Sequence, residues 1–131
     1  MTSEKHVFDA YAWIEYLIGS DVGKKVKAIL DNAEAEVYTC AVTVAEIISK
    51  TVREGRNFED AYDVIVSDSN VIDADEKLSK ETGLLHAEMR RKIKDFGLAD
   101  AYVLASARKI GGKVLTGDPH FKNVRDAILI N

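Results

Sequence analysis

Short runs of mostly apolar residues alternate along the whole chain with longer segments whose apolar positions recur at helical spacing. Short apolar runs without a polar alternation are typical of strands that are buried on both faces. We predict strands at His6–Asp9, Glu36–Cys40, Asn70–Ile72, Lys113–Thr116 and Ala127–Ile130.

The segments between the strands repeat apolar residues every three to four positions, as an amphipathic helix does. We predict helices at Ala10–Ile18, Val22–Asn32, Val44–Arg53, Phe58–Ser67, Ala74–Asp95 (with Gly83 as a point of bending) and Leu98–Ile110. This alternation predicts an α/β fold, a three-layer α/β/α sandwich around a central parallel sheet of about five short strands. Because right-handed crossovers bring every helix start to the carboxyl edge of such a sheet, we expect functional residues there.

The length and composition indicate a single unit. The chain has 131 residues, of which 47% are hydrophobic, and no linker, repeat or low-complexity tract divides it, so we predict one domain over residues 1–131. Its one cysteine, Cys40, lies in an apolar run and cannot form an internal disulfide, and the first residues do not resemble an export signal. No apolar run approaches the roughly 18 residues that a membrane span needs. We therefore expect a cytoplasmic protein that does not enter membranes.

The overall charge is acidic. The 22 Asp and Glu residues exceed the 18 Lys and Arg residues, which gives a formal net charge of −4. A protein that holds nucleic acid by surface charge alone is basic. If this chain acts on nucleic acid, something must therefore offset the acidic charge locally.

Two acidic residues near predicted strand ends have ordinary structural interpretations. Asp9 stands where the first strand turns into a helix, and an aspartate there readily accepts a hydrogen bond from the free N–H groups of the first turn. Thr43 and Glu46 have the spacing of a capping box, and Lys50 lies where it can pair with Glu46. Taken singly, each carboxylate is better explained by structure than by chemistry.

Asp100 is harder to explain as a structural residue. On a helical wheel it lies at the centre of the stripe formed by Val103, Leu104, Ala107 and Ile110, which faces the protein interior. An unpaired buried charge costs several kcal/mol, so an inward carboxylate needs a cation, a metal ion or several hydrogen-bond donors. An N-cap role stays open if the helix begins later than expected.

Asp118 follows the fourth predicted strand, in a Gly-Asp-Pro sequence that also suits an ordinary turn. Asp9, Glu46, Asp100 and Asp118 come from four distant parts of the chain, and all map to one edge of the predicted sheet. Carboxylates within about 4–6 Å of one another force protonation or a bound cation. Oxygen ligands without Cys or clustered His favour Mg²⁺ or Mn²⁺ over Zn²⁺.

These acidic segments resemble the PIN domain family, the small metal-dependent nucleases that include the VapC-type toxins of toxin–antitoxin pairs. The resemblance rests on Val7–Asp9 before a helix, Thr43–Glu46, Gly97–Ala107 and Leu115–Phe121, in the family's order. It spans residues 7–121, and the last two segments are the more specific. The segment from Arg53 to Phe96 shows no family pattern.

The resemblance implies hydrolysis of RNA phosphodiester bonds on a PIN-like α/β/α sandwich, with Mg²⁺ or Mn²⁺ held by the acidic residues. Asp9, Glu46, Asp100 and Asp118 fall on the family's acidic positions, which implies catalytic and metal-binding roles. Asp9, Asp100 and Asp118 would bind the metal directly or through water, and Glu46 would bind it or orient the attacking water. Thr116 falls on the family's Ser/Thr position and would support them by hydrogen bonding. The resemblance also implies a homodimer and a small inhibitory antitoxin.

The RNA backbone needs cations besides the metal, and the candidates include Lys50, Arg53 and His120, although His120 also suits a surface turn. Four aromatic residues can stack on a base, but their helical spacing favours packing in the core or in a dimer. These residues are Tyr11, Trp13, Tyr16 and Tyr102.

Three other functions stay open at this point. A housekeeping PIN nuclease of ribosomal RNA processing would use the same chemistry. A receiver-like signalling domain is also a small α/β protein with clustered carboxylates and Mg²⁺, but it places paired acids after the first strand, and this chain lacks them. A catalytically silent binding module would keep the acids without hydrolysis.

Overall fold

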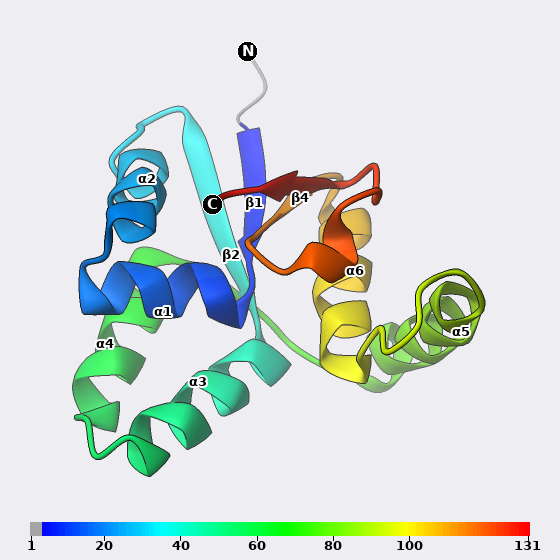
Figure 1. Ribbon diagram of the computed structural model, residues 1–131, viewed down its shortest axis with the longest axis horizontal. Coiled ribbons are helices and arrows are strands. Elements are labelled where there is room, and N and C mark those ends of the chain that lie inside the picture. Colours follow the sequence, from blue (N-terminus) through cyan, green and yellow to red (C-terminus); the bar gives the residue numbers. More distant parts are fainter. Residues whose placement is uncertain (1–3) are drawn as a thin grey trace.

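A central sheet of five parallel strands runs through the computed structural model, which describes residues 4–131 (Figure 1). The strands are β1 (Glu4–Phe8), β2 (Ala35–Cys40), β3 (Asn70–Ile72), β4 (Lys113–Thr116) and β5 (Ala127–Leu129). Their order in the sheet is β3-β2-β1-β4-β5, and every neighbouring pair is parallel. The predicted α/β fold is confirmed, and the first three residues of the predicted domain lie outside the described part.

Helices cover both faces of the sheet. They are α1 (Ala10–Ile18), α2 (Asp21–Leu30), α3 (Ala41–Arg53), α4 (Phe58–Asp68), α5 (Glu76–Lys92) and α6 (Leu98–Ile110), and a 3₁₀ turn, η1, spans Pro119–Phe121. Helices α1 to α4 lie on one side of the sheet and α5 and α6 on the other, which gives the three expected layers (Figure 1). Among the described residues, no helix is both long and apolar enough to cross a membrane.

Two hydrophobic cores, one on each face, explain the continuous apolar character of the strands. Successive residues of a strand point to opposite faces. In β1, Val7 belongs to the core beneath α5 and α6, and Phe8 belongs to the core beneath α1 to α4. Val114 and Leu115 of β4 repeat this division, and all four side chains are fully buried. A strand that feeds both cores has no polar face.

Helix α3 begins at Ala41, three residues before the predicted start at Val44, because the chain passes from β2 into the helix without a loop. Thr43 therefore lies inside the first turn, where its hydroxyl is buried and has no hydrogen-bond partner among residues 4–131. The predicted capping box with Glu46 is wrong. Lys50 pairs with Glu54 at 4.0 Å and not with Glu46.

Helix α5 is shorter than the predicted Ala74–Asp95. Asp75 caps it, since its Oδ1 accepts a hydrogen bond from the Leu78 N–H at 2.8 Å, and the helix therefore starts at Glu76. It runs through Gly83 as one continuous helix and ends at Lys92. The remaining boundaries agree with the predictions within two residues.

A pair of glycines tests the packing of α1 on α2. A Cβ at Gly23 would lie 2.1 Å from the Glu15 carbonyl oxygen, whereas a Cβ at Gly83 would meet no atom within 4 Å. We expect Gly23→Ala to lower the free energy of unfolding by about 1–3 kcal/mol, because the two helices must move apart. Gly83→Ala is the matched control and is expected to raise it by about 0.5–1 kcal/mol through helix propensity. Urea unfolding measures both, and a Gly23→Ala variant as stable as wild type would contradict this packing.

Candidate active site

The carboxyl edge of the sheet carries a hollow of about 340 Å³ where four acidic side chains meet. They come from the end of β1, the second turn of α3, the first turn of α6 and the segment after β4. The residues are Asp9, Glu46, Asp100 and Asp118. The structure thus brings together all four acids that the sequence placed at one edge, although they are far apart along the chain.

Asp9 is a helix cap and a member of this cluster at once. Its Oδ1 accepts a hydrogen bond from the Ala12 N–H at 2.9 Å, and the side chain is almost fully buried. Burial is the main cause that raises the pKa of Asp9 to about 7, and the charges of Asp100 and Asp118 add to it. Hydrogen bonds from Thr116 and from the Ala12 N–H act in the opposite direction. A carboxyl group with this pKa is readily ionised by a nearby cation.

Asp100 also combines a local role with the site. Its Oδ2 accepts a hydrogen bond from the Gly97 backbone N–H at 3.1 Å, which anchors the first turn of α6. The side chain is half-buried, with 23% of it exposed, so the inward direction predicted from the helical wheel holds only in part. Burial raises the pKa of Asp100, and the charge of Asp118 raises it further. The Gly97 hydrogen bond and His120 act in the opposite direction and lower it.

Glu46 extends into the hollow from α3 and completes the acidic set. The residue as a whole is exposed, yet partial loss of solvent around its carboxylate raises its pKa, and the charge of Asp100 adds to the effect. The charge of Asp100 on α6 thus reaches the Glu46 carboxylate on α3. Each carboxylate makes the ionisation of its neighbours more costly.

A short turn after β4 arranges Asp118 and its neighbours. The Thr116 hydroxyl accepts a hydrogen bond from the Asp118 N–H at 2.9 Å, and the Asp118 Oδ1 accepts one from the His120 N–H, also at 2.9 Å. This turn folds the imidazole back over the acids, so that His120 Nδ1 lies 3.0 Å from Asp118 Oδ1 and 3.9 Å from Asp100 Oδ2. His120 lies in a turn with 37% of its side chain exposed, as the surface-turn interpretation predicted, and its contact with the acids is a feature that the sequence did not show.

The donor set fits a divalent cation. Ligand atoms of Asp100, Asp118 and His120 all lie within 4.8 Å of one another. His120 Nδ1 is buried and makes no hydrogen bond of good geometry within residues 4–131. Asp9 and Glu46 line the same hollow, and carboxylate oxygens are the ligands that Mg²⁺ and Mn²⁺ prefer.

The residues predicted to bind the RNA backbone lie beside the acids. Lys50 and Arg53 line a groove of about 780 Å³ that shares Ala10, Tyr11 and Glu46 with the hollow. Among the aromatic candidates, Trp13 is buried and donates to the Thr39 hydroxyl at 3.0 Å, as its helical spacing indicated. Tyr11 differs, because it lines both the hollow and the groove.

Residues 6–127 match the family model described as PIN domain. Among solved structures, VapBC2 from Rickettsia felis, bound to a DNA fragment from its promoter, is similar with a TM-score of 0.74 at 16% identity, over 97% of this chain and 99% of that one. A toxin–antitoxin complex from Klebsiella pneumoniae is similar with a TM-score of 0.72 at 17% identity, over 94% of this chain and 95% of that one.

The VapC20 toxin of Mycobacterium tuberculosis, described as cleaving the sarcin-ricin loop, gives a TM-score of 0.71 at 15% identity, over 96% of this chain and 99% of that one. At such identities the similarity shows the fold alone. No curated protein sequence matches the chain closely enough to count as a relative.

Asp9→Asn tests the electrostatic cost of the cluster, since asparagine keeps an acceptor for the Ala12 N–H and removes the charge. The pKa of Asp9 rises from 3.8 to about 7 on folding, so ionisation of Asp9 destabilises the wild type increasingly between these pH values. Without divalent cations, we expect the stability of Asp9→Asn relative to wild type to increase by up to about 4 kcal/mol from about pH 4 to about pH 8. Urea unfolding across this range measures it, and a pH-independent difference would refute the assignment.

Proposed function

We propose that this chain, which belongs to the PIN domain family, is a Mg²⁺- or Mn²⁺-dependent endoribonuclease and the toxin of a VapBC-type pair. The observation that carries the proposal is the meeting of Asp9, Glu46, Asp100 and Asp118 in one hollow. The similar structures support the narrower assignment, because they include toxin–antitoxin complexes and a toxin described as cleaving the sarcin-ricin loop.

In the proposed site, Asp9, Asp100 and Asp118 hold the cation directly or through water, and Glu46 holds it or orients the attacking water. A bound divalent cation polarises the phosphoryl oxygens and lowers the pKa of a coordinated water. Thr116 supports the site by fixing the backbone of Asp118 and hydrogen bonding to Asp9. The buried Asp9 has lost most of its solvent, so its charge is available to a cation and not screened by water.

Lys50 and Arg53 would bind substrate phosphates from the adjoining groove, and His120 would contact the reacting phosphate beside Asp118. The proposal includes a cytoplasmic homodimer and a small antitoxin that inhibits it. A housekeeping nuclease of ribosomal RNA processing would have the same site without the antitoxin, and the PIN match over residues 6–127 disfavours a receiver-like domain.

Thermal unfolding with and without cations tests the metal site before any RNA substrate is known. At about 100 times its Kd, Mn²⁺ or Mg²⁺ is expected to stabilise the wild type by about 2.7 kcal/mol relative to EDTA. Asp100→Asn is expected to be more stable than wild type in EDTA, because it loses a repelling charge, and to respond little to the cation.

Asp63→Asn, an exposed change on α4 outside the hollow, is the control and is expected to respond to cations as wild type does. The metal site is disproved if cations stabilise neither protein and Asp100→Asn is simply less stable. Asp100 would then serve only as the acceptor for the Gly97 N–H.

RNA cleavage and growth arrest test the toxin assignment. With Mg²⁺ or Mn²⁺, we expect the purified protein to cut RNA internally and Asp100→Asn to be slower by more than about 100-fold, beyond the usual effect of residues that only support ligands. Expression of the wild type, but not of Asp100→Asn, is expected to stop growth until a small partner is co-expressed. Cleavage without growth arrest or a partner would favour the housekeeping nuclease.

A further inference from the structure

The acidic hollow continues into a groove between α1 and α3. Both helices begin at the carboxyl edge of the sheet and diverge from there (Figure 1). The hollow and the groove share three lining residues, Ala10, Tyr11 and Glu46. Tyr11 is the one aromatic residue of the three and therefore stands at the junction of the two spaces.

Gly117 allows Tyr11 to lie at this junction. A Cβ at position 117 would lie 2.1 Å from Tyr11 Cε1 and 2.4 Å from Cζ, so the ring packs directly on the backbone before Asp118. Any other residue at this position would displace the ring. The contact fixes the aromatic ring beside the acids, while the residue stays only half-buried and can meet a ligand in the hollow.

The two walls of the groove differ in chemistry. The α3 wall carries Lys50 and Arg53, and the α1 wall carries Tyr11, Ile14 and the acidic Glu15. Arg53 donates to the Ser49 hydroxyl at 3.3 Å and forms no ion pair within the described residues. Glu46 also lies on the α3 wall, where the groove meets the hollow, and Lys50 and Arg53 lie farther along the helix. Past Glu46, a polyanionic strand in the groove would direct its phosphates to Lys50 and Arg53, because Glu15 repels them from α1, and its bases to the ring and the aliphatic side chains of α1.

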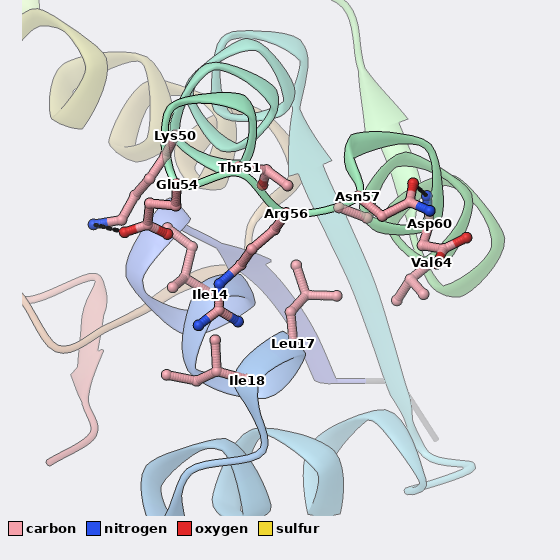
Figure 2. Close-up of a pocket in the computed structure, with 11 residues that line it drawn as sticks. Ile14, Leu17, Ile18, Lys50, Thr51, Glu54, Arg56, Asn57, Asp60 and Val64 are labelled. Carbon is pink, nitrogen blue, oxygen red and sulfur yellow. Dashed lines mark hydrogen bonds and ion pairs between the residues drawn. The ribbon is translucent and has the colours of Figure 1, made fainter.

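The groove also leads beyond Arg53. Ile14 and Lys50 line both this groove and a second pocket of about 490 Å³. Figure 2 shows that pocket, with the Arg56 guanidinium reaching over the aliphatic side chains of Ile14 and Ile18. The second pocket thus has Arg56, from the loop after α3, near an apolar surface of α1, and its lining also includes the acidic Glu54 and Asp60.

We infer that Tyr11 is a substrate-binding residue that stacks on an unpaired RNA base next to the reacting phosphate, with the adjoining single strand in the α1–α3 groove. The inference rests on the proposed nuclease function and adds the form of the substrate. A base within a duplex cannot stack on a protein ring, so this arrangement selects unpaired RNA. The direct continuity of the groove with the acids favours RNA over a peptide as its occupant.

Cleavage of a labelled single-stranded RNA of mixed sequence in Mg²⁺ tests the inference. We expect Tyr11→Leu to lower kcat/KM by about 5- to 100-fold, the usual effect of one lost stacking contact, mainly through a higher KM. Tyr11→Phe keeps the ring and is expected to restore most of the kcat/KM that Tyr11→Leu loses. Tyr62→Leu removes an exposed aromatic side chain of α4 outside the groove and is the matched control, with no expected change.

RNA with an abasic nucleotide at each position in turn separates stacking from a structural effect. With wild type, one abasic position beside the cut is expected to lower kcat/KM by a factor similar to that of Tyr11→Leu. With Tyr11→Leu, the same position is expected to have no further effect, because the contact is already lost. If Tyr11→Leu folds poorly, the effect of the abasic nucleotide can still be measured with wild type and Tyr11→Phe.

The outcomes separate this inference from the proposed function. If wild type cleaves RNA and Tyr11→Leu cleaves equally well, or no abasic position matters, the role of Tyr11 is disproved and the nuclease stands. If Tyr11→Leu cleaves normally but escapes inhibition by a purified antitoxin, the groove holds a peptide and the inference is overturned. If the wild type responds to no cation and cuts no RNA, the proposed function fails and the inference fails with it.

Discussion

The burial of carboxylates next to one another at the carboxyl edge of the sheet is the constraint on which the rest of the site depends. The parallel order β3-β2-β1-β4-β5 places the ends of β1 and β4 side by side and brings the starts of α3 and α6 next to them. Four acids then share a small hollow, and burial and mutual charge raise the pKa values of Asp9, Glu46 and Asp100. The raised pKa values are the electrostatic cost that folding places on this cluster, and a cation at such a site would lower that cost.

The same acids also accept hydrogen bonds that stabilise the local structure, and these bonds offset part of the electrostatic cost of burying the carboxylates. Asp9 caps α1, Asp100 accepts the Gly97 N–H before α6, and Asp118 begins the turn that carries His120. Each capping hydrogen bond stabilises a helix or turn start and orients one carboxylate at the same time. The capping interpretation of Asp9 and the turn interpretation of Asp118 are therefore confirmed, and the same hydrogen bonds hold both carboxylates at the shared hollow.

Some features escaped the sequence for physical reasons. The capping-box spacing of Thr43 and Glu46 has no meaning once β2 runs directly into α3, because Thr43 is then buried within the first turn. His120 is a turn residue, as one interpretation of the sequence had it, but only the three-dimensional structure shows that its imidazole returns to Asp118. Tyr11 shares the helical spacing of Trp13 and Tyr16, but its ring lies at the hollow because it packs on Gly117. Gly117 directly follows β4 and is therefore distant from Tyr11 in the sequence.

The sequence by itself determined the α/β class, the positions of the five strands and the four acids that lie at one edge. These follow from apolar periodicity and from the rule that parallel strands end at a common edge, both of which act locally or through simple topology. The tertiary structure alone decided how deeply each acid is buried, which hydrogen bonds it accepts, and that Tyr11 joins the hollow to the groove. Burial and contact depend on side chains from distant segments, and no local pattern encodes them.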